Sequence, residues 1–405
     1  MDYAIPNQFF VNITSYITSI IDNPTISKYL AFLPIALIAF LATFLITPII
    51  GKIAWSIKAT YKPRQKQKGK EFDNPAKAIH KKETPKLGGL AVTLPAFIIT
   101  LLCFQLNAFT IPILLSLTVL IIGATLDDIY NLNSRIQLGY QLLAVLIIVL
   151  SIIDLSKISF IDKDLLDLSA YTLQFNVFNL PVSIALPGDL ILFGWLILCL
   201  NAVKWVGGSP GLLESYSGVI FTLIFIVGIR TSSDLTSTMS IAMSGSLLAF
   251  LFYAMPPEKI MSGSSGRSVY GFMLPLLALI SDTKISTSIM LLGLPILDAI
   301  FVIINRIIKH KPKSIKELMQ INDATHLHHK LIELNLTRTQ VLLLESGAAL
   351  LLGSIAIATT GAMRYFGVIF GLALILLSIV AVHYYANKKK ELSAKKKSPE
   401  SKYSY

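Results

Sequence analysis

Apolar residues fill most of the chain in long blocks, and short polar segments separate one block from the next. A helix of roughly 20 apolar residues is long enough to cross a bilayer core, so each block predicts a membrane-spanning helix. The sequence therefore predicts an all-α, polytopic membrane helix bundle of about eleven transmembrane helices. The eleven expected spans are Tyr29–Ile50, Leu87–Leu106, Ala108–Thr125, Ile136–Ile153, Asp189–Val206, Gly211–Ile229, Thr236–Met255, Val269–Ser281, Lys284–Ile307, Thr339–Met363 and Tyr365–Tyr385.

Two segments depart from this pattern. Ile13–Ile21 is weakly amphipathic and is expected to lie on the membrane surface or to form a short arm. Between Asp154 and Pro187, alternation around Tyr171 predicts a short hairpin. The expected organisation is an N-terminal arm (residues 1–28), a single transmembrane domain (29–386) and a basic tail (387–405).

Composition excludes an ordinary soluble domain, because 54% of the 405 residues are hydrophobic and 14% are charged. Cys103 and Cys199 both fall inside apolar spans. This position argues against a disulfide framework or a thiolate metal site.

The net charge of +12 is distributed unevenly. If the N-terminus is outside, 29 of the 35 Lys and Arg residues fall on the inner side. The positive-inside rule then predicts an N-out, C-in orientation. This orientation of the protein in the membrane explains most of its positive charge, so no nucleic-acid partner is needed to account for it. The Lys-rich tail is expected to be solvated or to face membrane lipids.

Asp127 and Asp128 form an adjacent acidic pair directly after an apolar span. Such a pair at a membrane face can hold a divalent metal or take a proton from a phosphate. The alternative is that Asp128 caps the next helix and that Asp127 is merely solvated.

Other polar motifs fall on the same expected inner side. The segment His80–Gly89 ends in two glycines, which either allow an anion to approach the backbone or permit a close helix contact. Lys204 and Arg267 could hold phosphate oxygens or could serve only as positive-inside markers.

The last polar loop contains three histidines within four residues: His326, His328 and His329. If this segment is helical, His326 and His329 share one face. Such a cluster can bind phosphate, shuttle protons or bind a metal. Asp298 lies inside a span, where a lone carboxylate is costly, so it is expected to pair within the bundle.

Taken in order, these motifs resemble those of the polyprenyl-phosphate N-acetylhexosamine-1-phosphate transferases of glycosyltransferase family 4. The resemblance runs from about Asp73 to Gln340, and its His-Leu-His-His form is more similar to the N-acetylglucosamine branch than to the muramoyl-pentapeptide branch. The motifs are His-x-x-x-x-Pro-x-x-Gly-Gly at His80–Gly89, Asp-Asp-x-x-x-Leu at Asp127–Leu132 with Gln141, Asn-Ala at Asn201, Pro-x-x-Asp at Pro295–Asp298 and Asp-x-x-His-x-His-His at Asp323–His329.

This resemblance implies transfer of a sugar-1-phosphate from a UDP-N-acetylhexosamine to polyprenyl phosphate, with release of UMP, as the first step of cell-envelope glycan assembly. It implies a multi-pass protein of the plasma (inner) membrane with a cytoplasmic active site and a Mg²⁺ cofactor, and it leaves a homodimer open. Asp127 and Asp128 would engage the lipid phosphate and the metal, one of them as a base. The substrate-binding residues would be His80, Asn201, Lys204, Arg267, His326, His328 and His329.

The chain departs from the family pattern in two loops. The third loop of the family reads approximately Asn-x-x-Asn-x-x-Asp-Gly-x-Asp-Gly, but here Lys204, Gly207 and Pro210 replace the second Asn and both Asp. In the fourth loop, Ser264 replaces the Asp that ligates Mg²⁺, and Arg267 replaces a Ser.

These changes suggest that Lys204 and Arg267 partly replace the charge of the metal. They also favour a second interpretation, a catalytically silent relative that binds lipid phosphate or nucleotide. A transporter or channel would instead place charges deep in several spans, whereas the polar motifs here gather at one face.

Overall fold

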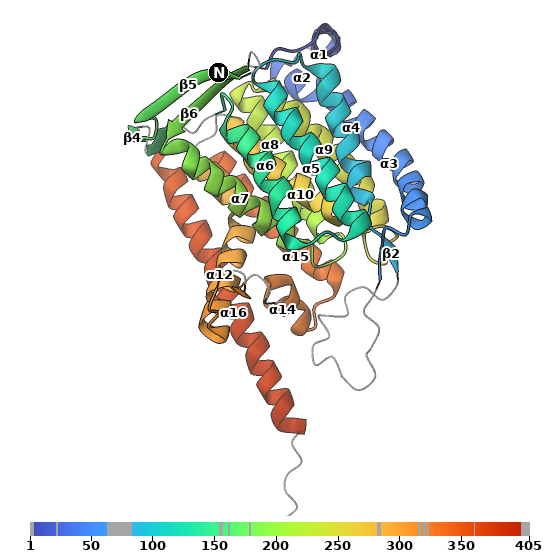
Figure 1. Cartoon of the computed structure of the whole chain (residues 1–405), viewed down its shortest axis with the longest axis vertical. Coiled ribbons are helices and arrows are strands. Elements are labelled where there is room, and N and C mark those ends of the chain that lie inside the picture. The colour runs from blue at the N-terminus through green and yellow to red at the C-terminus, as the bar shows by residue number, and fades with distance from the viewer. Residues whose placement is uncertain are drawn as a thin grey trace, which may run out of the picture.

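The computed structural model describes residues 4–21, 23–62, 83–153, 157–160, 163–177, 180–281, 285–314, 317–318, 321, 324–359 and 361–397. It confirms an all-α membrane bundle to which a few short strands are added (Figure 1). The helices are α1 (Gln8–Ile20), α2 (Pro24–Leu30), α3 (Leu33–Ser56), α4 (Gly88–Cys103), α5 (Thr110–Tyr130), α6 (Ser134–Val149), α7 (Gly188–Val206), α8 (Leu212–Thr231), α9 (Asp234–Ala254), α10 (Gly263–Ile280), α11 (Ile285–Leu291), α12 (Gly293–His310), α14 (Leu327–Glu333), α15 (Arg338–Ala358) and α16 (Gly361–Lys397).

Seven of the described helical segments are long and apolar enough to cross a membrane. They show that the protein is a multi-pass membrane protein. The segments are Thr25–Ser56, Thr110–Tyr130, Gly188–Val206, Leu212–Thr231, Asp234–Ala254, Arg338–Ala358 and Met363–Ser393. Each of the eleven expected spans overlaps a helix, but the number of crossings and the orientation stay predictions.

Helices α8 and α9 form the centre of the bundle. In their apolar windows 67% and 78% of the residues are buried, against 33% for the segment that contains α3 and 22% for the one that contains α16. Outward-facing side chains of α3 include Leu37, Leu41 and Leu45, each about half exposed. Such apolar side chains suit contact with lipid tails, so the outer helices present the lipid-facing surface.

Several expected spans have different boundaries in the structure, and the ninth and the eighth are the two that bear on the site. The ninth, Lys284–Ile307, is divided into α11 and α12 at Leu292. Pro295 lies in the first turn of α12, where a missing backbone N–H costs no hydrogen bond, whereas in one continuous helix the proline would remove one. The eighth, Val269–Ser281, begins earlier, because α10 starts at Gly263 and is 18 residues long.

The strands form three two-stranded antiparallel sheets. They are β1 (Thr60–Tyr61) with β2 (Thr84–Pro85), β3 (Lys157–Phe160) with β4 (Lys163–Asp167), and β5 (Tyr171–Val177) with β6 (Leu180–Leu186). The last pair confirms the expected hairpin, with Tyr171 opposite Leu186.

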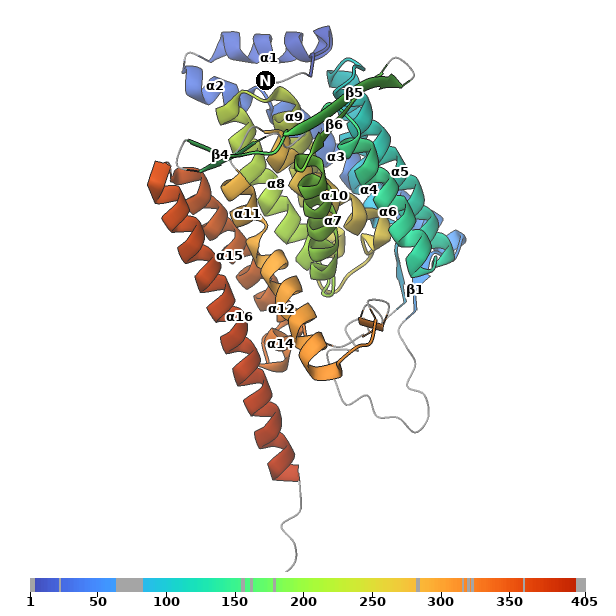
Figure 2. The ribbon, with the colours of Figure 1, turned by 60° about the vertical axis from the view of Figure 1, so that its left-hand side comes forward.

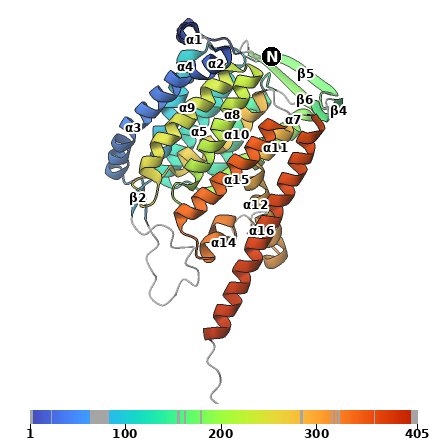
Figure 3. The ribbon, with the colours of Figure 1, turned by 180° about the vertical axis from the view of Figure 1, so that it is seen from behind.

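The non-membrane segments gather at opposite ends of the bundle. Helices α1 and α2 and the β5–β6 hairpin lie at one end, and β2 and α14 lie at the other, as Figures 1 and 2 both show. From behind, α15 and α16 cover one side, and α16 extends past α14 (Figure 3). Loops expected to be outside and inside are therefore separated by the length of the bundle, while the proposed division into arm, domain and tail stays a prediction.

Candidate functional site

A cavity of about 710 Å³ opens where α6, α7, α10, α12 and α14 meet. Its volume is in the range of small-molecule sites. The described residues that line it are Ser134, Gln137, Leu138, Gln141, Asn201, Lys204, Trp205, Gly207, Gly208, Arg267, Ile303, Arg306, Leu318, Ile321, His326, His328 and His329.

Asp128 caps a helix, but not the next one in sequence. One carboxylate oxygen accepts the backbone N–H of Ser264 at 2.7 Å, and the other accepts the N–H and the hydroxyl of Ser265 at 3.0 and 2.9 Å. These donors are at the N-terminus of α10, where a carboxylate is stabilised by unpaired N–H groups and by the helix dipole. Helix α6, the next helix, is capped by Asn133 instead.

The turn that begins α10 requires glycine. Gly263 has a φ of +66°, a conformation that other residues rarely adopt. A Cβ at this position would also collide with the carboxylate of Asp128 and the carbonyl of Lys86. The glycine thus lets Asp128 reach the first N–H groups of the helix.

Asp127 is buried beside Asp128 at the end of α5 and is 5% exposed rather than solvated. Its Oδ1 accepts the amide of Gln137 from α6 at 2.9 Å. Lys204 Nζ lies 3.5 Å from Gln137 Oε1, at the outer limit of a hydrogen bond. Gln137 therefore lies between the aspartate and a cation of the cavity.

Asp298 pairs within the protein, as expected. Its Oδ2 lies 2.8 Å from Nδ1 of His326, and its Oδ1 accepts the backbone N–H of Leu327 at 2.9 Å. The ring of Trp205 lies 5.4 Å from the ring of His326. These contacts fix the orientation of His326 in the cavity wall.

The prediction that His326 and His329 share one face of a helix is wrong. His326 is the N-cap of α14 with extended backbone (ψ 151°), so its side chain does not follow the helical spacing. Its ring is instead parallel to that of His328 at 5.9 Å, and the ring of His328 lies 4.2 Å from that of His329. All three rings still line the same cavity.

His328 and His329 are held neutral by their surroundings. Burial, and then the neighbouring histidines, lower the pKa of His328 well below its usual value. The same causes lower the pKa of His329 to about 4. Nε2 of His328 and Nδ1 of His329 are buried without a hydrogen-bond partner among the described residues.

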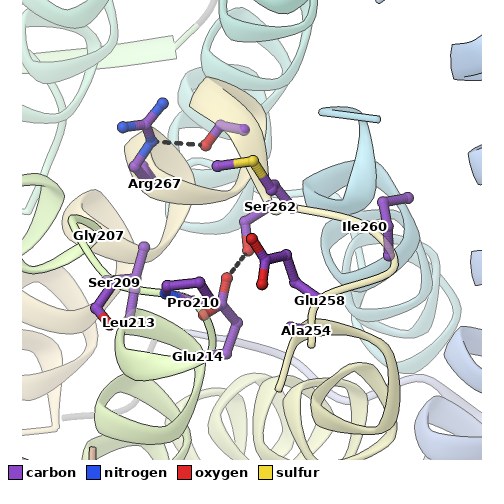
Figure 4. Close-up of a pocket in the computed structure, with 13 residues that line it drawn as sticks. Gly207, Ser209, Pro210, Leu213, Glu214, Ala254, Glu258, Ile260, Ser262 and Arg267 are labelled. Atoms are coloured by element: carbon purple, nitrogen blue, oxygen red, sulfur yellow. Dashed lines mark hydrogen bonds between the residues drawn. The ribbon is translucent and has the colours of Figure 1, made fainter. Parts of the chain in front are cut away.

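Arg267 separates the large cavity from a small one of about 30 Å³, because it lines both. Its Nε donates to the carbonyl of Gly263 at 2.9 Å (Figure 4). The small cavity is lined by two acids, Glu258 and Glu214, and the latter is hydrogen-bonded to Ser262. A space of this size holds about one water, so it is too small for a substrate.

The structure gathers most of the predicted site residues. Asn201, Lys204, Arg267 and the three histidines line the cavity, whereas Asp127 and Asp128 lie behind its wall. His80 and Asp323 lie outside the described residues. The glycines that follow His80 bind no anion through their N–H groups, since Gly88 and Gly89 donate to Met261 and Ser262 in a close helix contact.

The sequence prediction assigned no binding role to Gln137 or Arg306. Gln137 lies between Ser134 and Gln141 at helical spacing, so the three form a polar face on an otherwise apolar helix. This polar face was the signal in the sequence that could have assigned Gln137 to the site. Arg306 follows Asp298 by eight residues, which places both on one buried face of α12.

The described residues do not fit a magnesium site. Among them no three His, Cys, Asp or Glu side chains gather so as to hold a metal ion. Both oxygens of Asp128 already accept hydrogen bonds, and Ser264 contributes a donor where the family has a carboxylate ligand. Magnesium requires oxygen ligands, and the described wall of the cavity offers cations instead.

Comparison with known proteins shows which family the chain resembles. The family model described as "Glycosyl transferase family 4" matches residues 109–282, from α5 to the end of α10. A similar protein, the probable undecaprenyl-phosphate N-acetylglucosaminyl 1-phosphate transferase of Bacillus subtilis (strain 168), is 26% identical over 330 residues, 78% of this chain and 80% of the relative. Over this region the chain is similar to glycosyl transferase family 4.

Other proteins similar to this chain are phospho-N-acetylmuramoyl-pentapeptide-transferases. That of Prochlorococcus marinus subsp. pastoris (strain CCMP1986 / NIES-2087 / MED4) is 27% identical over 327 residues, 77% of this chain and 86% of the relative. That of Clostridium botulinum (strain Alaska E43 / Type E3) is 27% identical over 252 residues, 61% of this chain and 74% of the relative. The matched family region contains the acidic pair, Lys204 and Arg267 but not the histidines.

Proposed function

We propose that the protein transfers a sugar-1-phosphate from a UDP-sugar, of the N-acetylhexosamine type, to polyprenyl phosphate. The observation that carries this proposal is one cavity in a membrane bundle similar to family 4, lined by Lys204, Arg267 and His328 from distant segments of the chain. The activities for which these relatives are named support the same reaction class. The B. subtilis relative supports N-acetylglucosamine as the sugar.

In this reaction an oxygen of the lipid phosphate attacks the sugar-bearing phosphorus of the donor. A new P–O bond forms, the bond to the UMP oxygen breaks, and UMP leaves with the electron pair. Such a transfer depends on positioning and on neutralising the phosphate charge more than on covalent chemistry. The cavity contributes three cations for this purpose, namely Lys204, Arg267 and Arg306.

We assign different roles to the two aspartates. Asp128 holds the N-terminus of α10 and positions Arg267 on its first turn. Asp127 is hydrogen-bonded to Gln137 at the cavity wall, and we assign it to the acceptor phosphate. His326, oriented by Asp298, and His328 are assigned to the donor.

We place this chemistry on the cytoplasmic face of the plasma membrane. Residues of α14 line the cavity, and α14 lies at the end of the bundle away from α1 (Figure 2). The loops expected at that end carry most of the Lys and Arg residues. Positive loops remain on the cytoplasmic side of membrane proteins. UDP-sugars would then reach the cavity from the cytoplasm, and the lipid phosphate would reach it from the inner leaflet.

The direct test is an assay of the purified protein with UDP-N-acetylglucosamine, radiolabelled in the sugar, and undecaprenyl phosphate. The proposal predicts a labelled lipid-linked product and one UMP released per sugar transferred. UDP-N-acetylgalactosamine and UDP-glucose in parallel reactions identify the sugar. Binding of the donor without any lipid-linked product, in several lipid mixtures, would contradict the proposal.

A silent relative that binds lipid phosphate or nucleotide is the second candidate. The engagement of both Asp128 oxygens favours it, since the hydrogen bonds at the start of α10 leave this carboxylate fewer lone pairs for a metal. This candidate predicts the same binding as the enzyme but no release of UMP. The radiolabel assay therefore distinguishes the two.

A further inference from the structure

The described charged residues that line the large cavity are all positive. They are Lys204 on α7, Arg267 on α10 and Arg306 on α12, and none of the described lining residues is Asp or Glu. Three separate helices thus direct positive charge to one space. A cavity of this kind attracts an anion rather than a metal ion.

The carboxylates near the cavity are occupied by donors of the protein itself. Asp127 accepts from Gln137, Asp128 accepts from the start of α10, and Asp298 is bonded to His326. Gln137 and His326 are lining residues, whereas the aspartates stand behind them. The hydrogen bonds of Asp127 and Asp298 therefore orient two lining residues, Gln137 and His326.

Arg267 retains most of its capacity to bind phosphate. The described structure gives a partner to Nε alone, the carbonyl of Gly263. A guanidinium has five N–H donors in a planar fork, so four remain for an anion. Bidentate binding of phosphate oxygens is the contact for which this geometry is best suited.

A second and independent feature of the same wall also indicates a ligand. His328 is 2% exposed, and its Nε2 has no hydrogen-bond partner among the described residues. A buried polar atom without a partner costs free energy unless a ligand or water satisfies it. Gly208 approaches this nitrogen so closely that a Cβ would collide with it, so His328 is held in place at the cavity.

We propose that this cavity binds the diphosphate of a nucleotide without a divalent cation, and that Arg267 and Lys204 provide the charge that a metal would otherwise supply. The inference rests on the proposed function for the choice of a nucleotide as ligand. A nucleotide-sugar diphosphate carries one negative charge on each phosphate, and the two cations match them in number.

The test is calorimetric titration of UDP into the purified full-length protein, once with EDTA and once with excess Mg²⁺. The proposal predicts affinities within about threefold of each other in the two conditions. Arg267→Gln and Lys204→Gln should each weaken binding at least tenfold in EDTA. Binding that requires Mg²⁺, or variants that bind as tightly as the natural protein, would overturn the inference.

Matched variants separate charge from folding. Arg135→Gln removes an exposed arginine that does not line the cavity, so it should bind UDP as the natural protein does. Arg267→Lys and Lys204→Arg keep the charge and should retain affinity to within about threefold. If these two conservative variants lose binding as completely as the glutamine variants, the charge argument is wrong.

A second arm uses a short, soluble polyprenyl phosphate in EDTA. If it binds in a manner sensitive to Arg267 while UDP does not bind, the cation pair serves the acceptor and the nucleotide inference fails. UDP binding in EDTA without lipid-linked product supports the inference and contradicts the transferase. Binding and turnover that both require Mg²⁺ would support the transferase function and contradict the inference.

Discussion

At the scale of single residues, Asp127 and Asp128 are adjacent in sequence but perform separable tasks. Asp128 is bonded through both oxygens to the first residues of α10, whereas the described partner of Asp127 is the amide of Gln137. The sequence predicted that both residues act in one site, because two adjacent aspartates give no reason to assign them different roles. Only the contact with α10, 136 residues away, distinguishes them.

Asparagine at each position tests this separation. Asp127→Asn should lower the rate of sugar transfer at least 100-fold, a typical loss for a group acting on a proton or phosphate, with little effect on stability. Asp128→Asn should also destabilise the protein, by about 1–3 kcal/mol, because an N–H donor then loses its acceptor. Transfer rates and thermal unfolding midpoints measure the two effects. Equal midpoints for the two variants would contradict the assignment.

The buried histidines predict how stability depends on pH. The pKa of His329 is lowered to about 4 and that of His328 well below its usual value, while an unfolded histidine titrates near 6.5. Between these values the unfolded chain binds more protons, so stability is complete above pH 6.5 and falls as the pH drops toward 4. The loss is at most about 1.4 kcal/mol per pH unit for each histidine.

Thermal unfolding between pH 7.5 and 4.5 measures this dependence. His329→Asn should reduce the fall in midpoint on acidification, whereas His310→Asn, at an exposed position on α12, should leave it unchanged. A midpoint that falls as steeply for His329→Asn as for the natural protein would show that another group is responsible.

At the scale of elements, the cavity depends on how α7 ends and how α14 begins. Helix α7 ends at Val206, and Gly208 in the following turn lies against the ring of His328. The sequence indicated the turn through its glycines and proline. It could not indicate the position of the histidines, because His326 is a helix cap and not part of the helix.

Gly208→Ala tests this contact. The added Cβ would displace the ring of His328, so UDP binding should weaken about tenfold or more while the bundle stays folded. Gly194→Ala on α7 is the matched control, since no atom lies within 4 Å of its added Cβ. Its binding and unfolding midpoint should equal those of the natural protein or improve slightly through helix propensity. Unchanged binding in Gly208→Ala would contradict the proposed role of His328.

At the scale of the whole molecule, hydropathy was sufficient to predict the bundle. Every expected span overlaps a helix, since apolar blocks of this length have few alternatives to a buried or lipid-facing helix. The division of α11 from α12 and the early start of α10 were not predictable from hydropathy, because Pro295 and Asp128 act through local and long-range hydrogen bonding. The cation-lined cavity likewise results from α7, α10 and α12 converging at one end.

The orientation is tested by labelling introduced cysteines in intact cells. Gln174→Cys on the β5–β6 hairpin should react with a membrane-impermeant maleimide from outside, whereas exposed Arg135→Cys should react only after permeabilisation. Cys103 and Cys199 are buried, so the natural protein should give little background. Labelling of Arg135→Cys from outside would place the cavity on the wrong side for a cytoplasmic UDP-sugar.

The central claim is that the cation-lined cavity is the site of the donor nucleotide. Photo-crosslinking with a photoreactive analogue of UDP-N-acetylglucosamine in EDTA, followed by peptide mapping, tests it most directly. The account predicts that the label falls within residues 201–208 and 324–333 and is abolished by excess unmodified donor. Label at the opposite end of the bundle, or label that excess donor does not displace, would contradict it.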